Sequence, residues 1–243
     1  MFKQEIIELI PIEKDVDLLL QKAGFYIQTY RFIEALPILD NALEIVEDNN
    51  VRWPMKSAVY QICGQVHIFL DPNIDDGLNY FIKSYEIIED GNKKADVACK
   101  IAKYFLQEGA LMKAKEYAEK ALQTATESEP QSIIYQIQGG IALKEGDYTR
   151  AIELMNKAAE LAESSKFLAQ LAMIIMDLTT VFIKIGKPET ALSEICRAER
   201  YVKESHNPDL YMRCAIRKAK ILYSMKKDEE AKKLIIALDE QKI

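Results

Sequence analysis

Residues 145–162, EGDYTRAIELMNKAAELA, carry a pattern that recurs along the chain. It opens with a glycine–aspartate turn, and the residues that follow alternate small and large apolar side chains at helical spacing. Ala151, Met155 and Ala158 are separated by four and then three positions, which places them on one face of a helix. The pattern predicts a helix that approaches a neighbouring helix closely through its small side chains.

Five further segments of the chain carry the same pattern. In each, a turn is followed by a small residue, and the small residues lie 37 to 42 positions apart: Ala35, Gly77, Ala114, Ala151, Ala191 and Ala231. Another helical segment precedes each one and has its own small residue, at Ala23, Gly64, Ala102, Gly139, Thr179 and Ala219. A period near 40 residues fits two helices joined by short turns, repeated along the chain.

This code of small and aromatic residues on a helix-turn-helix hairpin resembles the tetratricopeptide repeat. The resemblance covers about residues 13–241, and the period exceeds the family's usual length of about 34 residues. It is similar to the long-helix branch of cargo-binding and peptide-sensing members. The second repeat departs most, with Gly77 and the longer turn DPNIDD, and the sixth has Leu238 in place of its last small residue.

The resemblance implies an all-α fold, an α-solenoid wound as a right-handed superhelix of about six hairpins. We expect one domain over residues 1–243. Its repeats are predicted at about 13–48, 52–90, 93–127, 130–163, 166–204 and 208–241.

Prolines mark where these helices should begin. Pro54, Pro130 and Pro208 fall at the starts of first helices, and Pro188 falls in the first turn of a second helix. Proline is tolerated there because the first amides of a helix have no partner within the helix. Pro37 lies deeper, and it predicts either a kink or a helix that begins late.

Composition and charge exclude several classes of protein. The net charge is −6, and the lysines form no basic stripe, so we expect no nucleic-acid partner. No apolar run approaches the roughly 20 residues that span a bilayer, and the amino terminus has no signal-peptide core. The four cysteines share no metal-ligand or redox spacing, which predicts reduced thiols and a cytoplasmic location.

Candidate chemical motifs are weak. Asp71, Asn73 and Asp75 alternate as in a calcium loop, but the sixth position is not glycine and the twelfth is Ile82 rather than glutamate, so a helix-capping turn is favoured. Cys63 and His67 share a helix face, yet a zinc site needs more ligands than these. We find no nucleophile elbow, triad or phosphate loop. The sequence therefore predicts no metal, no cofactor and no enzymatic activity.

The resemblance also implies a ligand groove, because the first helices line the concave face in that family. Carried over position by position, the polar members of a peptide-binding groove are Gln61, Gln65, Lys103, Gln107, Gln136, Lys144, Lys184, Arg213 and Lys220. Cations outnumber the acids Asp17 and Asp96 in this stripe, although the chain is acidic. This predicts a protein or peptide partner with acidic residues or a free carboxylate. The alternative is that these lysines only maintain solubility.

Two functional hypotheses remain open. The first is a non-catalytic scaffold or adaptor that binds a protein segment in the groove. The alternative is a cytoplasmic sensor of a regulatory peptide, like the repeat domains of Gram-positive pheromone-responsive regulators. Only about 12 residues precede the first repeat, so we expect no DNA-binding domain. One face of the last helix must cover the preceding hairpin. Ile236 is surplus to that face, so we expect it to form part of a homodimer contact.

Overall fold

The computed structural model describes residues 2–70 and 75–240, with side chains over 12–70 and 75–238. In these residues the chain forms twelve α-helices and no strand. In chain order they are α1 (Phe2–Gln28), α2 (Phe32–Asp48), α3 (Trp53–Leu70), α4 (Asp75–Ile87), α5 (Gly91–Gln107), α6 (Leu111–Thr124), α7 (Ser128–Glu145), α8 (Tyr148–Ser164), α9 (Leu168–Lys184), α10 (Pro188–Ser205), α11 (Pro208–Ser224) and α12 (Asp228–Glu240).

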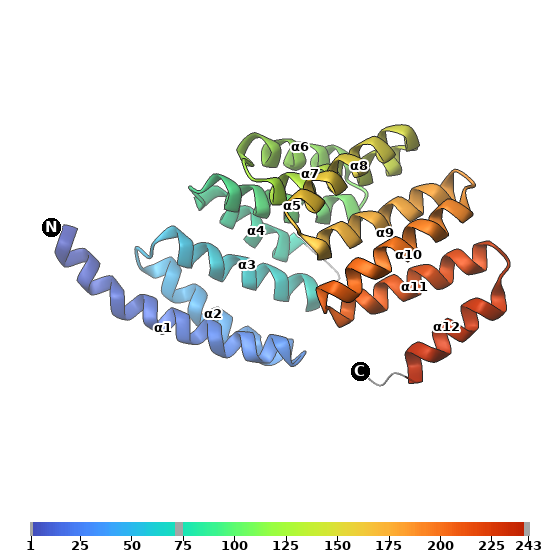
Figure 1. Ribbon diagram of the computed structural model, residues 1–243. Coiled ribbons are helices and arrows are strands. Elements are labelled where there is room, and N and C mark those ends of the chain that lie inside the picture. The colour runs from blue at the N-terminus through green and yellow to red at the C-terminus, as the bar shows by residue number, and fades with distance from the viewer. Residues whose placement is uncertain (1, 71–74, 241–243) are drawn as a thin grey trace. The chain divides into compact units, whose positions relative to one another are not determined.

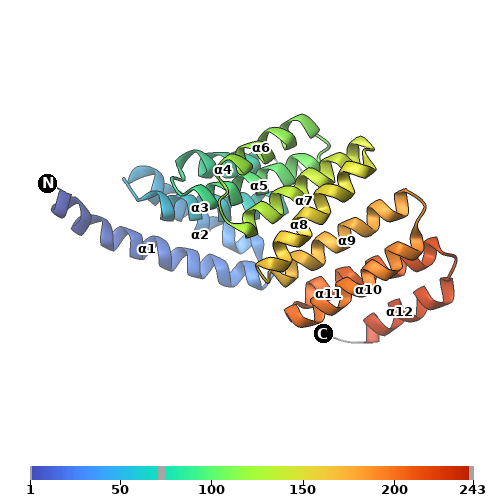
Figure 2. The same cartoon turned by 45° about the horizontal axis from the view of Figure 1, so that its top comes forward.

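The chain divides into two compact units, Met1–Tyr104 and Phe105–Ile243, and α5 crosses the boundary. In the first unit α1 packs against α2, α2 against α3, and α3 against α4 (Figure 1). In the second unit α7 to α12 pack in the same consecutive way, and Figure 2 shows α9, α10 and α11 side by side. The predicted all-α hairpin repeat is confirmed, whereas the single domain and its exact repeat boundaries stay predictions.

Small residues lie where the two helices of a hairpin meet. The alanines that open the pattern in the second helices, at 35, 114, 151, 191 and 231, are all fully buried. The residue four positions later fills the space beside the contact. In the fourth hairpin Met155 of α8 lies directly against Gly139 of α7, where an added Cβ would stand 2.7 Å from the methionine Cγ. The repeat period in the sequence therefore reflects a close contact between the two helices of a hairpin, which recurs along the chain.

A contact of this kind between α3 and α4 involves two glycines. Gly64 and Gly77 face each other so closely that a Cβ on Gly64 would stand 2.8 Å from the Gly77 carbonyl oxygen. A Cβ on Gly77 would stand 2.7 Å from the carbonyl oxygen of Gly64. The glycine that made the second repeat look irregular in sequence thus matches a second glycine on the facing helix.

The turns inside the hairpins also repeat. In the described turns a residue one or two positions after the first helix has a left-handed backbone, with φ of 58° at Tyr30, 77° at Gly109, 82° at Gly146, 72° at Gly186 and 60° at Lys226. The amide of the next residue donates to the carbonyl oxygen five positions earlier, as in Asp147 to Ala142 at 2.9 Å. This hydrogen bond satisfies a free carbonyl at the end of the first helix. Each turn therefore reverses the chain in the same geometry.

The prolines lie where predicted. Pro208 and Pro188 begin α11 and α10, and Pro54 and Pro130 lie in the first turns of α3 and α7. Pro37 lies inside α2, which begins at Phe32, so the expectation of a helix that begins late is wrong. The turn at residues 71–74, which holds most of the calcium-like motif, lies outside the described residues.

We predict that Gly64→Ala destabilises the chain and Gly24→Ala does not. The added methyl at position 64 meets backbone, so the hairpin must open, at a cost of about 1–3 kcal/mol. At position 24 of α1 nothing lies within 4 Å, and alanine there should raise helix stability by roughly 0.5–1 kcal/mol. Urea unfolding followed by circular dichroism measures both. Equal effects of the two substitutions would contradict the close contact.

Candidate functional site

A polar contact joins the neighbouring first helices α3 and α5. The ammonium of Lys100 in α5 donates to Oε1 of Gln61 in α3 at 2.8 Å. The same ammonium pairs with Asp96, one turn earlier in α5, also at 2.8 Å. Lys100 and Asp96 are both about half exposed, at 41% and 49%, so this cluster is open to solvent on one side.

Hydrogen bonds to two buried serines fix the side chain of Gln61. Its amide donates to Oγ of Ser57 at 3.1 Å, and the Ser57 hydroxyl lies 3.0 Å from that of Ser84 in α4. Both serines are buried. Buried polar groups need partners, and this short chain of hydrogen bonds supplies them. The amide plane of Gln61 is thereby fixed, with its oxygen directed toward α5.

Beside this contact lies a hollow of about 470 Å³. Its floor is apolar, formed by Ala58, Ile62, the Phe81 ring and the Tyr104 ring, with the two ring centroids 5.5 Å apart. Burial raises the pKa of Tyr104, so its phenol stays neutral at physiological pH. The polar side chains of the hollow are Gln61, Gln65 and Lys100. An apolar floor with a few polar groups is typical of a ligand site.

A second polar network joins first helices in the other unit. Gln136 of α7 donates to Oδ2 of Asp177 in α9 at 2.6 Å and accepts from the amide of the buried Gln170 at 2.7 Å. Asp177 lies 3.9 Å from the guanidinium of Arg217 in α11, which also donates to the Thr180 hydroxyl. Gln136 thus uses both ends of its amide within the chain.

The predicted groove residues are divided between the two units, and their grouping into one groove stays a prediction. Gln61 and Gln65 line the hollow between α3 and α5, whereas Lys103 is half-buried nearby and does not line it. Lys144 and Lys184 are exposed in the last turns of α7 and α9. There each lysine favours its helix through the helix dipole, which supports the alternative that they have no ligand.

The remaining predicted residues lie elsewhere. Gln107 is exposed at the end of α5, and the exposed Arg213 lies 4.0 Å from Asp209 in its own helix. Lys220 lines a second hollow, between α11 and α12, together with Tyr223.

Sequence reasoning missed Lys100 and Tyr104. Both belong to α5, and Lys100 lies 39 residues after its partner Gln61, which is one repeat period. Polar residues one period apart are the signal that could have identified this pair. Position-by-position transfer from the resembled family selected Lys103 instead, because it assigns positions within one helix and ignores contacts between successive first helices.

The three buried cysteines are unreactive at neutral pH. Burial raises the pKa of Cys63 and Cys99 to about 12 and that of Cys214 to about 11. At neutral pH these thiols are protonated and therefore poor nucleophiles and poor metal ligands. Cys196, by contrast, is exposed on α10.

The described residues contain neither a cluster of metal-binding side chains nor a membrane-spanning helix. No group of three or more His, Cys, Asp or Glu side chains there could hold a metal ion, and His67 packs against Tyr80 with ring centroids 5.4 Å apart. In the same part of the chain no helix is both long and apolar enough to cross a membrane.

Comparison with known proteins gives the fold. No protein-family model and no curated protein matches the chain. Among solved structures, BtubC from P. vanneervenii is 17% identical with a TM-score of 0.68, over 85% of this chain and 87% of that one. Aspartyl phosphate phosphatase F from Bacillus subtilis is 13% identical with a TM-score of 0.71, over 93% and 70% of the two chains.

A third similar structure is NprR in complex with its cognate peptide NprX. It is 18% identical with a TM-score of 0.68, over 93% of this chain and 66% of NprR. The chain has the tetratricopeptide-repeat fold. The resemblance seen in the sequence is thus confirmed for the fold.

We predict that Cys196 alone reacts with iodoacetamide in the folded chain at pH 8. The other three thiols are buried, and their raised pKa values leave almost no thiolate. Mass spectrometry should find one label per native chain, none after Cys196→Ser, and full labelling after unfolding. Labelling of Cys63 or Cys99 as fast as Cys196 would contradict the packing described here.

Proposed function

We propose that this chain is a non-catalytic peptide-binding module and that the hollow between α3 and α5 holds part of the ligand. The observation that carries the proposal is the combination of an apolar floor with the polar groups of Gln61, Gln65 and Lys100, of which Gln61 and Lys100 are oriented by hydrogen bonds. The ligand is a segment of a protein or a short peptide, and the chain acts as a scaffold or adaptor for it.

The chemistry of these groups suits a peptide. Glutamine amides both donate and accept, so the exposed Gln65 can bond the backbone of an extended segment without selecting its side chains. Gln61 already donates to Ser57 and accepts from Lys100, and its amide keeps one N–H and one oxygen lone pair for the same backbone. The aromatic floor offers contact area to an apolar side chain, since burial of one such side chain is worth about 1.5–3 kcal/mol. Lys100 favours an acidic residue or a terminal carboxylate nearby.

Lys100 already forms an ion pair with Asp96, and a ligand carboxylate can take its place only if this pair is weak. Its ion pair with Asp96 is half exposed on both sides. Pairs of this kind contribute only about 0–1 kcal/mol, because water screens them. A ligand carboxylate that also forms other contacts in the hollow can therefore replace Asp96 at little cost.

The similarity to NprR supports a peptide ligand, because that repeat fold binds its cognate peptide NprX. It equally supports the narrower hypothesis of a receptor for a regulatory peptide. The two versions differ in whether the ligand needs its own chain end. A receptor for a free peptide should lose affinity when the peptide carboxylate is amidated, whereas an adaptor for internal segments should not.

Three earlier expectations accompany this proposal. Lys103 in the first unit, and Lys144, Lys184, Arg213 and Lys220 in the second, are each proposed as a further contact for acidic partner residues within their own unit. A cytoplasmic location also stays a prediction, and a homodimer through α12 is the alternative that the association experiment below distinguishes from a head-to-tail contact.

The proposal predicts that a library of heptapeptides with free carboxyl termini contains ligands of the chain. For the tightest peptide, Lys100→Met combined with Gln65→Ala should raise Kd by tenfold or more, because both polar contacts are lost. Fluorescence polarisation of the labelled peptide measures Kd. The amidated form of the same peptide decides between the two versions of the function.

Lys115→Met is the matched control. Lys115 of α6 is exposed to 43% and forms an ion pair with Glu145 of α7, away from the hollow between α3 and α5. Its loss should leave Kd unchanged. A library without ligands, or equal affinity in the hollow variant and the wild type, would contradict the proposal.

A further inference from the structure

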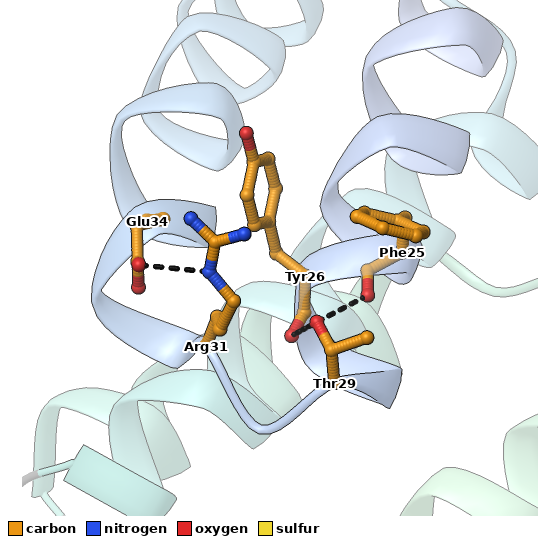
Figure 3. Close-up of polar contacts among 5 residues, drawn as sticks. All are labelled: Phe25, Tyr26, Thr29, Arg31 and Glu34. Carbon is orange, nitrogen blue, oxygen red and sulfur yellow. Dashed lines mark hydrogen bonds and ion pairs between the residues drawn. The ribbon is translucent and has the colours of Figure 1, made fainter.

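The first helix α1 has an exposed apolar stripe that its counterparts bury. Leu18, five residues before Ala23, is 66% exposed. In the later first helices the same position is at most 1% exposed: Val59, Val97, Ile134, Ile174 and Cys214. Phe25, two residues after Ala23, is 60% exposed. Figure 3 shows its ring on a different side of α1 from Tyr26, which lies toward Arg31.

The position of Phe25 is likewise apolar and covered elsewhere. Its counterparts Val66, Ile141, Val181 and Ile221 are at most 2% exposed, and Tyr104 is half-buried. Leu18 and Phe25 are seven residues apart and therefore lie on one face of α1. In the later first helices this face packs against the preceding hairpin. Within the described chain, Leu18 and Phe25 of α1 have no preceding hairpin to bury them.

A matching surface lies on the last hairpin. Ile235, four residues after Ala231 in α12, is 45% exposed, whereas its counterparts Leu39, Phe81, Ala118, Met155 and Ile195 are at most 3% exposed. It lines the hollow between α11 and α12, which has a volume of about 470 Å³. The other lining residues are Met212, Ile216, Ala219, Lys220, Tyr223 and Leu238.

Internal junctions show which positions meet there. The thiol of Cys214, at the position of Leu18, lies 4.0 Å from the carbonyl oxygen of Ile195, at the position of Ile235. The ring of Tyr104, at the position of Phe25, packs against Phe81, also at the position of Ile235. Leu18 and Phe25 thus occupy the positions that cover the residue equivalent to Ile235 at an internal junction.

The polar positions match as well. Arg217, two residues before the small residue of α11, donates to Thr180, one residue after the small residue of α9. The equivalent pair across the two ends is Gln21 of α1 and Lys220 of α11. Gln21 donates its amide to Asp17 at 2.8 Å, which leaves its carbonyl oxygen and the carboxylate as acceptors for a lysine. The two ends are therefore complementary in charge as well as in apolar surface.

We propose that two copies of this chain associate head to tail, with α1 of one copy seated in the hollow between α11 and α12 of the next. The contact reproduces the junction between successive hairpins. It is heterologous, because different surfaces of the two copies meet. Such a contact continues into longer arrays or closes into a ring, and it does not stop at a symmetric dimer.

Two variants of the 243-residue chain test the direction of the contact. Leu18→Asp with Phe25→Asp blocks the α1 surface, and Ile216→Asp with Ile235→Asp blocks the hollow. In sedimentation velocity the wild type should form larger species as its concentration rises, and each variant alone should associate at least tenfold more weakly. A mixture of the two variants should form a one-to-one heterodimer and nothing larger, because one intact surface of each kind remains.

Met112→Asp is the control, since Met112 is 79% exposed on α6 and takes no part in the contact; it should associate like the wild type. Circular dichroism confirms that each variant is folded. As a test that leaves the apolar residues intact, Lys220→Glu should weaken association and Asp17→Lys in the same chain should restore it.

A wild type that stays monomeric at high micromolar concentration would overturn the proposal. So would dimers that persist in the Leu18→Asp, Phe25→Asp variant, because they would indicate a symmetric contact through α12. Peptide binding by the hollow between α3 and α5 is measured separately and does not depend on either outcome.

Discussion

The close approach of the two helices in each hairpin is the constraint on which the structure depends. Small residues allow this approach, and between α3 and α4 only the hydrogen atoms of Gly64 and Gly77 fit between the backbones. Such a contact fixes the position of one helix along the other, because a shift by one residue would bring a larger side chain into the gap. Side chains at fixed distances from the small residues therefore fall at equivalent places in every hairpin.

The fixed alignment of the helices places polar residues of successive first helices opposite each other. Gln61 meets Lys100, and Gln136 meets Asp177, from the same relative positions in their helices. The outcomes differ because the surroundings differ. Gln136 is held by Gln170 as well as Asp177, whereas Gln61 and Lys100 border an open hollow above Phe81 and Tyr104. One repeated geometry thus yields a closed network in one unit and a candidate ligand site in the other.

The sequence predicted the hairpins well because their small residues and turns are local signals. The alanines from Ala35 to Ala231, the glycine turns and the helix-starting prolines lie as expected. The site was predicted only in part. The sequence named Gln61 and Gln65 among the residues that line the candidate site but not Lys100, because its place there depends on a contact with the preceding repeat. The exposure of Leu18 and Ile235 was also out of reach, because their sequence positions match those of buried counterparts.

Hydrogen exchange of the chain, with and without its tightest library peptide, tests the binding surface most directly. Bound peptide should slow exchange in the middle of α3 and in residues 96–104 of α5, where Gln61, Lys100 and Tyr104 border the hollow. Exchange in α2, which does not line the hollow, should be unchanged. Protection confined to α2, or to α8 and α10 of the second unit, would contradict the assignment of the hollow between α3 and α5 as the ligand site.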